Sequence, residues 1–203
     1  ARFQTHQPAS GFDWLALIEY QPRRDLSLYF LARFKSRGEE YISADVFGRE
    51  IRLLSDATRG SYRLHADYQV HPKVRLRSRV DIVRTATASE EKGWGFLVYQ
   101  DIRFYPWSRL QVDARVTLFD TDGFNARVYQ FENDLLYVMS NSMLFDQGQR
   151  MYVVAKAEVS PWLDIWIKAA TTIYQNRNTV GSGLNQIDGN RRSDIGIQAR
   201  VRF

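Results

Sequence analysis

Apolar and polar residues alternate with a period of two through most of the sequence, most clearly around four of its prolines. The stretches QPRRDLSLYF, HPKVRLRSRV, YPWSRLQVDA and SPWLDIWIKA contain Pro22, Pro72, Pro106 and Pro161. A period of two places successive side chains on opposite faces of a β-strand. Proline fixes its own φ and lacks the N–H that a strand ladder uses, so each stretch predicts two antiparallel strands joined by a tight turn.

The predicted strands are long, and this limits where they can be placed. Strands in soluble proteins usually have about five or six residues, whereas a strand that crosses a membrane needs about 9–11. Lipid offers no hydrogen bonds, so membrane strands must close on themselves. The pattern therefore predicts an all-β, antiparallel, transmembrane outer-membrane β-barrel. A soluble β-sandwich or open sheet is the alternative, because its strands also alternate.

One face of the predicted strands is ionic, and we interpret it as a luminal polar lattice. Its members are Arg63, His65, Asp67, Arg75, Arg77, Arg79, Asp81, Asp101, Arg103, Asp113, Arg115, Lys156, Glu158, Asp164, Lys168, Arg200 and Arg202. In a narrow lumen these charges would have to pair. In a wider barrel the arginines would line an aqueous pore that prefers anions.

The last ten residues, DIGIQARVRF, resemble the terminal strand of bacterial outer-membrane barrels. Ile197, Ala199, Val201 and Phe203 alternate with polar residues up to the last position. In such barrels this strand is what the assembly machinery recognises, so the resemblance implies two partners, outer-membrane lipid and the barrel-assembly machinery. An ordinary edge strand that ends in Phe is the alternative.

The alternation divides the chain into about eleven strands. They cover residues 12–21, 26–36, 60–70, 75–85, 93–104, 110–120, 125–132, 134–141, 150–159, 162–174 and 194–203. With the C-terminus in the periplasm, all four proline turns fall on that side, provided that a turn lies at Glu132–Asp134. Bacterial single-chain barrels have an even number of strands. Because ARF at residues 1–3 looks like the tail of another strand, we predict about 12 strands or, preferably, the C-terminal part of a larger barrel.

Two stretches resemble a known family. YQDIRFYPWSRLQVDARVTLFDTDGFNARVYQFENDLLYV and NTVGSGLNQIDGNRRSDIGIQARVRF are similar to the C-terminal barrel of Bacteroidota proteins that carry an N-terminal helix-hairpin-helix region. The resemblance covers most of residues 12–203. It implies a Gram-negative outer-membrane location and no catalytic residues. It also predicts that residues 1–203 are a single β-barrel domain that lacks upstream strands or an N-terminal domain, with any DNA contact made through a region not present here.

Candidate chemical motifs are incomplete. The chain has no cysteine, which excludes disulfides and thiolate metal sites. FDTDGFN begins like a calcium loop but lacks the distal Glu, so a tight Asp-Gly turn is the better interpretation. GSGLNQIDGN lacks the Lys-Ser/Thr ending of a phosphate loop and is interpreted as an outer loop. His65 and Asp67 share a face while Ser78 has the opposite parity, so they form no catalytic triad.

We therefore expect no enzyme activity, no metal and no cofactor. The sequence favours a non-enzymatic scaffold or anchor in the outer membrane, or one subunit of an assembly with other envelope proteins. One alternative is a passive channel for small, anionic solutes. Another is a DNA-handling or surface-binding protein whose specificity lies in the missing N-terminal region or in the outer loops.

Overall fold

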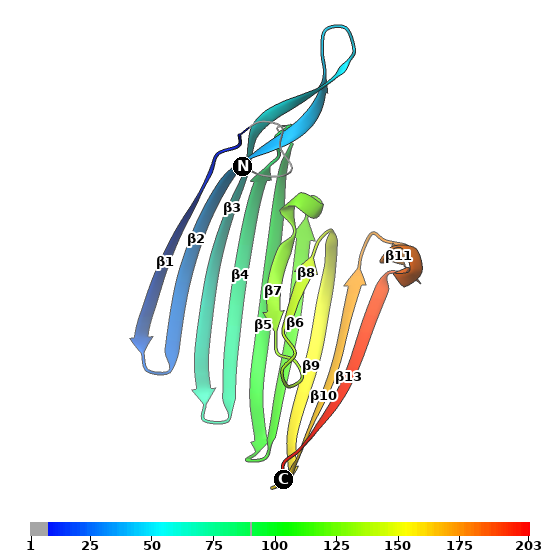
Figure 1. The fold of residues 1–203 in the computed structure, drawn as a ribbon. Helices are drawn as coiled ribbons and strands as arrows, with labels where there is room; N and C mark the ends of the chain where they lie inside the picture. The colour runs from blue at the N-terminus through cyan, green and yellow to red at the C-terminus, as the bar shows by residue number, and fades with distance from the viewer. Residues whose placement is uncertain (1–7, 90) are drawn as a thin grey trace.

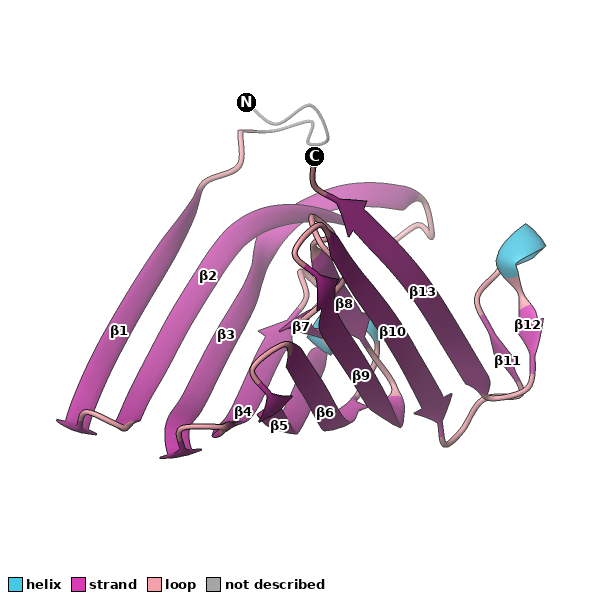
Figure 2. Cartoon of the chain, turned by 90° about the horizontal axis from the view of Figure 1, so that it is seen from below, coloured by secondary structure: helices cyan, strands magenta, loops and turns pink. Residues whose placement is uncertain are grey.

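The computed structural model describes residues 8–89 and 91–203, and its regular structure is almost entirely β-strand. Nine antiparallel strands form one curled sheet in the order β1-β2-β3-β4-β5-β6-β9-β10-β13 (Figures 1 and 2). These strands are β1 (Gly11–Arg23), β2 (Leu26–Ala44), β3 (Glu50–His71), β4 (Val74–Ala86), β5 (Lys92–Trp107), β6 (Leu110–Thr121), β9 (Gln147–Ser160), β10 (Leu163–Tyr174) and β13 (Arg191–Val201). The short strands are β7 (Val128–Glu132), β8 (Ser140–Leu144), β11 (Thr179–Val180) and β12 (Ile187–Asp188).

The two ends of the sheet differ in their connections. The tight turns after β1, β3, β5 and β9 lie at one end together with the C-terminus, which confirms that the proline turns share a side (Figure 1). We call this the turn end. The longer connections lie at the opposite end, which we call the loop end. No helix in the described part of the chain is long and apolar enough to cross a membrane.

Strands β2 and β3 extend further than the sequence pattern predicted. Their pairing continues from Arg37 opposite Ala57 to Ala44 opposite Glu50, beyond the ends of β1 and β4. The result is a two-stranded arm that projects from the loop end (Figure 1). The charged sequences SRGEE and FGRE in this region interrupt the apolar alternation, which is why the prediction stopped at residue 36.

The prediction that residues 125–132 and 134–141 are two barrel strands is wrong. β6 pairs directly with β9, from Leu110 opposite Ala157 to Asp120 opposite Gln147. β7 and β8 pair with each other and lie on the concave face of the sheet (Figure 2). Each has five residues, too few to cross a membrane. The proline turns still share one end of the sheet as predicted, because taking two consecutive strands out of the barrel leaves the direction of every other strand unchanged. We call residues 128–144 the inner hairpin.

The two faces of the sheet have the predicted character. Leu64, Ile82, Val116 and Ile197 are exposed on the convex face, where the parity placed them for contact with lipid. Ser78 also faces outward, and its hydroxyl donates a hydrogen bond to Gln100 Oε1 at 2.6 Å, so this polar pair is satisfied without water. The predicted ionic row lies on the concave face, and it is there that the inner hairpin packs.

Candidate functional site

The concave face brings the predicted lattice residues together as ion pairs. Those between predicted members are Arg63–Asp81, Arg75–Asp67, Arg77–Asp101, Arg79–Asp81, Arg103–Asp113, Arg115–Asp101, Lys156–Glu158, Arg200–Asp164 and Arg202–Asp164. Lys168 pairs instead with two acids of the inner hairpin, Glu132 and Asp134. Most of these pairs cross from one strand to its neighbour, because side chains opposite each other on one face of a sheet lie about 5 Å apart.

Asp101 is fully enclosed, as is Asp164: neither side chain has any exposed area. The carboxylate of Asp101 accepts hydrogen bonds from Arg77 Nη2 at 3.0 Å and from Arg115 Nη2 at 2.6 Å. The hydroxyl of Tyr152 also donates to it at 3.4 Å. A buried carboxylate is tolerated when cations and donors replace its lost water. Through Asp101 the strands β4, β5, β6 and β9 share one polar network.

Two further carboxylates repeat this arrangement. Asp81 accepts hydrogen bonds from Arg63 Nε at 2.9 Å and from Arg79 Nε at 2.8 Å. Asp113 accepts one from Arg103 Nε at 2.6 Å. Both carboxylates are buried, so each depends on its arginine partners for compensation of its charge.

Three predicted residues differ from the rest. Lys156 and Glu158 pair at 3.2 Å but remain 33% and 45% exposed, so water screens this pair. The ring of His65 stacks on Tyr29 at a centroid distance of 4.8 Å, and among the described residues His65 has no ion pair and its buried Nδ1 has no hydrogen-bond partner. The lattice therefore has an enclosed part over β4–β6 and a solvated margin.

Arginines of the sheet hold the inner hairpin through its main chain. Each donates to a carbonyl oxygen in or next to β7, where the carbonyl does not face β8. The bonds are Arg59 Nη2 to Arg127 O at 2.6 Å, Arg79 Nη2 to Tyr129 O at 2.9 Å and Arg115 Nη1 to Phe131 O at 2.6 Å. Since Arg79 and Arg115 also bind buried carboxylates, the same guanidinium groups stabilise the lattice and the hairpin.

Acidic side chains fix the other side of the hairpin to β9 and β10. Glu132 accepts hydrogen bonds from Arg150 Nε at 2.5 Å and Nη2 at 2.8 Å, and from Ser142 Oγ at 2.8 Å. Lys168 Nζ lies 2.5 Å from Asp134 Oδ2 and 3.4 Å from Glu132 Oε2. Glu132 is on the inner hairpin and not on a membrane-spanning strand. Burial is the largest single influence on Glu132 and would raise its pKa, but the hydrogen bonds from Arg150 and Ser142 together with the charges of Arg150 and Lys168 outweigh it and lower that pKa to about 2.

An apolar cluster completes the contact at the loop end. Its members are Val83, Leu97, Tyr99, Phe119, Val128, Leu144, Tyr174 and Val180. Val128 and Leu144 belong to the inner hairpin, Val180 belongs to β11, and the others belong to the large sheet, which forms the wall around the hairpin. Gly95 faces the same space, and a Cβ at this position would overlap the carbonyl oxygen of Ala126, just before the hairpin. The wall is thus shaped to admit the hairpin.

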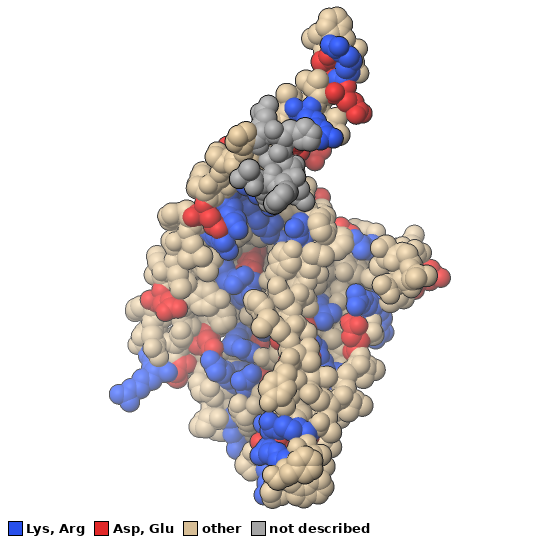
Figure 3. Space-filling view, in the orientation of Figure 1, with Lys and Arg blue, Asp and Glu red and all other residues tan. Residues whose placement is uncertain are grey.

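Beside the hairpin, a cationic groove remains open along β2 and β3. Two adjoining pockets of about 280 and about 270 Å³ lie there, and Arg59 and Tyr129 line both. The cations that line them are Arg33, Lys35, Arg37, Arg59, Arg63 and Arg127. Figure 3 shows Lys and Arg side chains gathered on this face over β2–β4, next to the mostly uncharged surface of the hairpin. This groove could admit small anions.

The concave face offers little for catalysis or metal binding. Within residues 8–89 and 91–203 no group of three or more His, Cys, Asp or Glu side chains could hold a metal ion. Ser78 lies on the convex face, opposite to the side of His65. In the calcium-like stretch, Asp122 accepts a hydrogen bond from the backbone N–H of Trp94 at 2.7 Å, and the chain then enters a 3₁₀ turn at Phe124–Ala126.

Sequence reasoning did not find the inner hairpin or its two acidic anchors. Glu132 and Asp134 were assigned only to a turn between barrel strands. A signal was present: Gln130 and Glu132 have the parity of Val128, so one face of this segment mixes polar and apolar residues. A face of this mixed kind can pack against the charged concave face of the sheet but not against lipid.

Comparisons with known proteins concern the fold. No family model and no curated protein match the chain. Among solved structures, OmpT, an outer membrane protein of Vibrio cholerae, is similar with a TM-score of 0.53 at 9% identity, over 93% of this chain and 55% of that one. The NanC porin is similar with a TM-score of 0.42 at 9% identity, over 96% of both chains, and we draw no argument from it.

The comparison with OmpT and the topology of the sheet agree on one class of protein. The chain has the all-β, antiparallel fold of outer-membrane β-barrels, and it spans about half the length of the OmpT structure that it matches. The resemblance to barrels that follow a helix-hairpin-helix region stays a prediction.

Proposed function

We propose that this chain forms part of a non-enzymatic outer-membrane β-barrel that acts as a scaffold or anchor in the envelope, with its lumen occupied by the inner hairpin. One observation carries the proposal: buried charges of the wall bind the hairpin on both of its sides. Arg115 and Arg150 are examples, since one binds a hairpin carbonyl and the other a hairpin carboxylate. A segment held by buried, charge-assisted hydrogen bonds is costly to displace.

The same contacts favour a non-catalytic role. Asp81, Asp101, Asp113 and Glu132 are all buried and each is bound by at least one arginine. A general acid or base needs a carboxyl group that can exchange protons with a substrate near neutral pH. Carboxylates bound in this way have their oxygens occupied by the ion pairs of the lattice.

The proposal includes closure of the barrel by strands beyond the nine. β1 pairs only with β2 and β13 only with β10 among the described residues. Each outer edge therefore presents unpaired N–H and C=O groups, which lipid cannot satisfy. Further strands of the same protein would pair with both edges and bring the total to an even number.

Electrical recordings in planar bilayers test the occupied lumen. We expect no steady conductance from the full-length protein, and steady steps when residues 124–145 are replaced by a short Gly-Ser link. Removal of residues 39–55 from the projecting arm is the control, and this variant should show no steady conductance. Steady steps from the unaltered protein would contradict the scaffold proposal.

A second candidate function is a passive channel for small anions, and the cationic groove beside the hairpin favours it. In that case the unaltered protein would conduct with anion selectivity, and Arg59→Gln would reduce the selectivity because Arg59 lines both pockets of the groove. The same recordings therefore separate the two candidates.

A further inference from the structure

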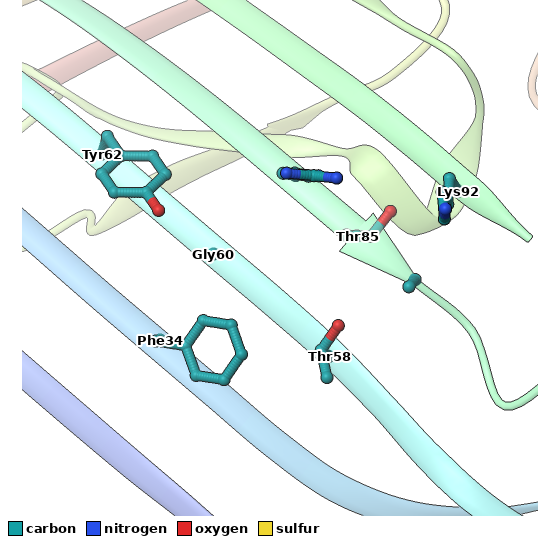
Figure 4. Close-up of a pocket in the computed structure, with 8 residues that line it drawn as sticks. Phe34, Thr58, Gly60, Tyr62, Thr85 and Lys92 are labelled. Atoms are coloured by element: carbon teal, nitrogen blue, oxygen red, sulfur yellow. The ribbon is translucent and has the colours of Figure 1, made fainter. Parts of the chain in front are cut away.

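The convex face carries a polar hollow at the loop end, away from the lumen. Its volume is about 190 Å³, and it lies over β2, β3, β4 and the start of β5 (Figure 4). Gly60 is at its centre, paired with Phe34 on one side and with Arg84 on the other. A Cβ on Gly60 would meet the Tyr62 side chain first, at the ordinary contact distance of 3.6 Å, so Gly60 leaves room beside the rings of Phe34 and Tyr62.

Two cations line this hollow, Arg84 and Lys92. Within the part of the chain that the structure describes, neither has a carboxylate partner. The Arg84 guanidinium lies 5.3 Å from the ring centroid of Trp94. Two acids that lie beside Trp94 are bound elsewhere: Asp122 accepts a hydrogen bond from the Trp94 backbone, and Asp120 accepts one from Gln147 Nε2 at 3.0 Å.

The position of these cations on the convex face is informative. Towards the turn end, the outward-facing residues are uncharged from Ile82 to Leu76 on β4 and from Trp94 to Phe104 on β5. Arg84 and Lys92 therefore stand where the apolar band ends. A Lys or Arg on the lipid face of a barrel is strongly unfavourable at the bilayer midplane and nearly neutral close to the interface. The interface is also where lipid phosphates lie.

We propose that this hollow binds the phosphate group of a membrane lipid in the leaflet at the loop end. A guanidinium and an ammonium match the charge of a phosphate, and Arg in particular bonds phosphate oxygens in a forked geometry. Thr58 and Tyr62 supply hydroxyl groups at the same place. The exposed ring of Phe34 would contact the acyl chains. A lipid fits better than a free anion because the hollow opens sideways on the face that contacts lipid. This inference rests on the proposed membrane location.

Native mass spectrometry of the full chain in a non-ionic detergent can measure the apparent Kd for phosphatidic acid. We expect Arg84→Gln or Lys92→Gln alone to weaken binding about fivefold, and the double variant about thirtyfold. Gly60→Val should also weaken binding, since it fills the hollow at unchanged charge. Arg24→Gln with Lys73→Gln removes two exposed cations at the turn end and should leave the Kd unchanged.

Two results would overturn the lipid site: equal Kd values for the wild type and the Arg84→Gln/Lys92→Gln variant, or inorganic phosphate bound as tightly as phosphatidic acid. Insertion is measured separately, by protease protection and heat-modifiable gel mobility in phosphatidylcholine vesicles. Failure of the wild type to insert would contradict the membrane proposal. Insertion without retention of phosphatidic acid would contradict only the lipid site.

Discussion

Asp101 joins four strands through a carboxylate with no exposed area, and its removal tests whether the lattice is buried. Asp101→Ala leaves Arg77 and Arg115 without their shared acid, so we expect a loss of about 3–5 kcal/mol in the free energy of unfolding. Glu158→Ala is the matched control, because its exposed pair with Lys156 should contribute under about 1 kcal/mol. Urea unfolding in lipid vesicles measures both. Equal, small losses would show that water fills the space around Asp101.

Glu132 makes the docking of the inner hairpin dependent on pH. Its folded-state pKa of about 2 lies below the ordinary value of 4.5, because the hydrogen bonds and charges of Arg150, Ser142 and Lys168 together outweigh the effect of burial. A lowered pKa means that the stabilisation is fully present above pH 4.5 and is lost as the pH falls towards 2. Tyrosine fluorescence or NMR of the hairpin should follow this loss, and Glu132→Gln should abolish it. A transition near neutral pH would contradict this assignment.

At the scale of elements, Gly95 tests how closely the inner hairpin packs against the wall. A side chain at this position would overlap the carbonyl of Ala126, so Gly95→Val should displace the start of the hairpin while strands β4–β6 stay paired. Hydrogen exchange should rise at residues 126–132 and stay low on β5. Gly60→Val is the control, since it faces the convex side without a clash. Unchanged protection of the hairpin in Gly95→Val would contradict the packing described here.

The last strand carries the predicted assembly signal. Ile195, Ile197 and Val201 are exposed along the free edge of β13, and Phe203 follows as an exposed terminal residue. We expect deletion of Phe203 to lower outer-membrane levels in cells, while the purified variant still refolds in detergent with normal thermal stability. Normal membrane levels of the deletion variant would show that recognition does not depend on this residue.

The elements that could be predicted from the sequence are those whose two faces meet different surroundings. β4, β5, β6, β10 and β13 alternate over most of their length because one face is mainly apolar and exposed and the other carries most of the charges. The inner hairpin could not be placed in this way, since β7 and β8 touch a polar wall and no lipid. The projecting arm of β2 and β3 has solvent on both faces, so nothing imposes alternation on residues 37–57. The location of these two elements depends on contacts between residues far apart in the sequence, such as Arg115 with Phe131 and Lys168 with Asp134.

For the whole molecule, the face on which the charges of the sheet lie was predictable, but their pairing and the acids of the inner hairpin were not. Parity placed Arg63, Asp81 and Asp101 on one face, and in the structure all three belong to ion pairs between neighbouring strands. The partners depend on register: Arg63 is opposite Asp81, and Asp101 lies between Arg77 and Arg115. A shift by one residue would move every one of these charges to the lipid face. The lattice therefore also specifies the register of the sheet.

The central claim is that residues 128–144 lie inside the barrel. A spin label on Phe131→Cys tests it most directly, because Phe131 is 61% exposed on the hairpin and would face lipid if residues 125–132 were a barrel strand. A label on Val116→Cys, on the convex face of β6, is the control. In vesicles we predict that the label at 131 is accessible to a water-soluble nickel complex and the label at 116 to oxygen dissolved in lipid. An oxygen-accessible, nickel-protected label at 131 would contradict the account.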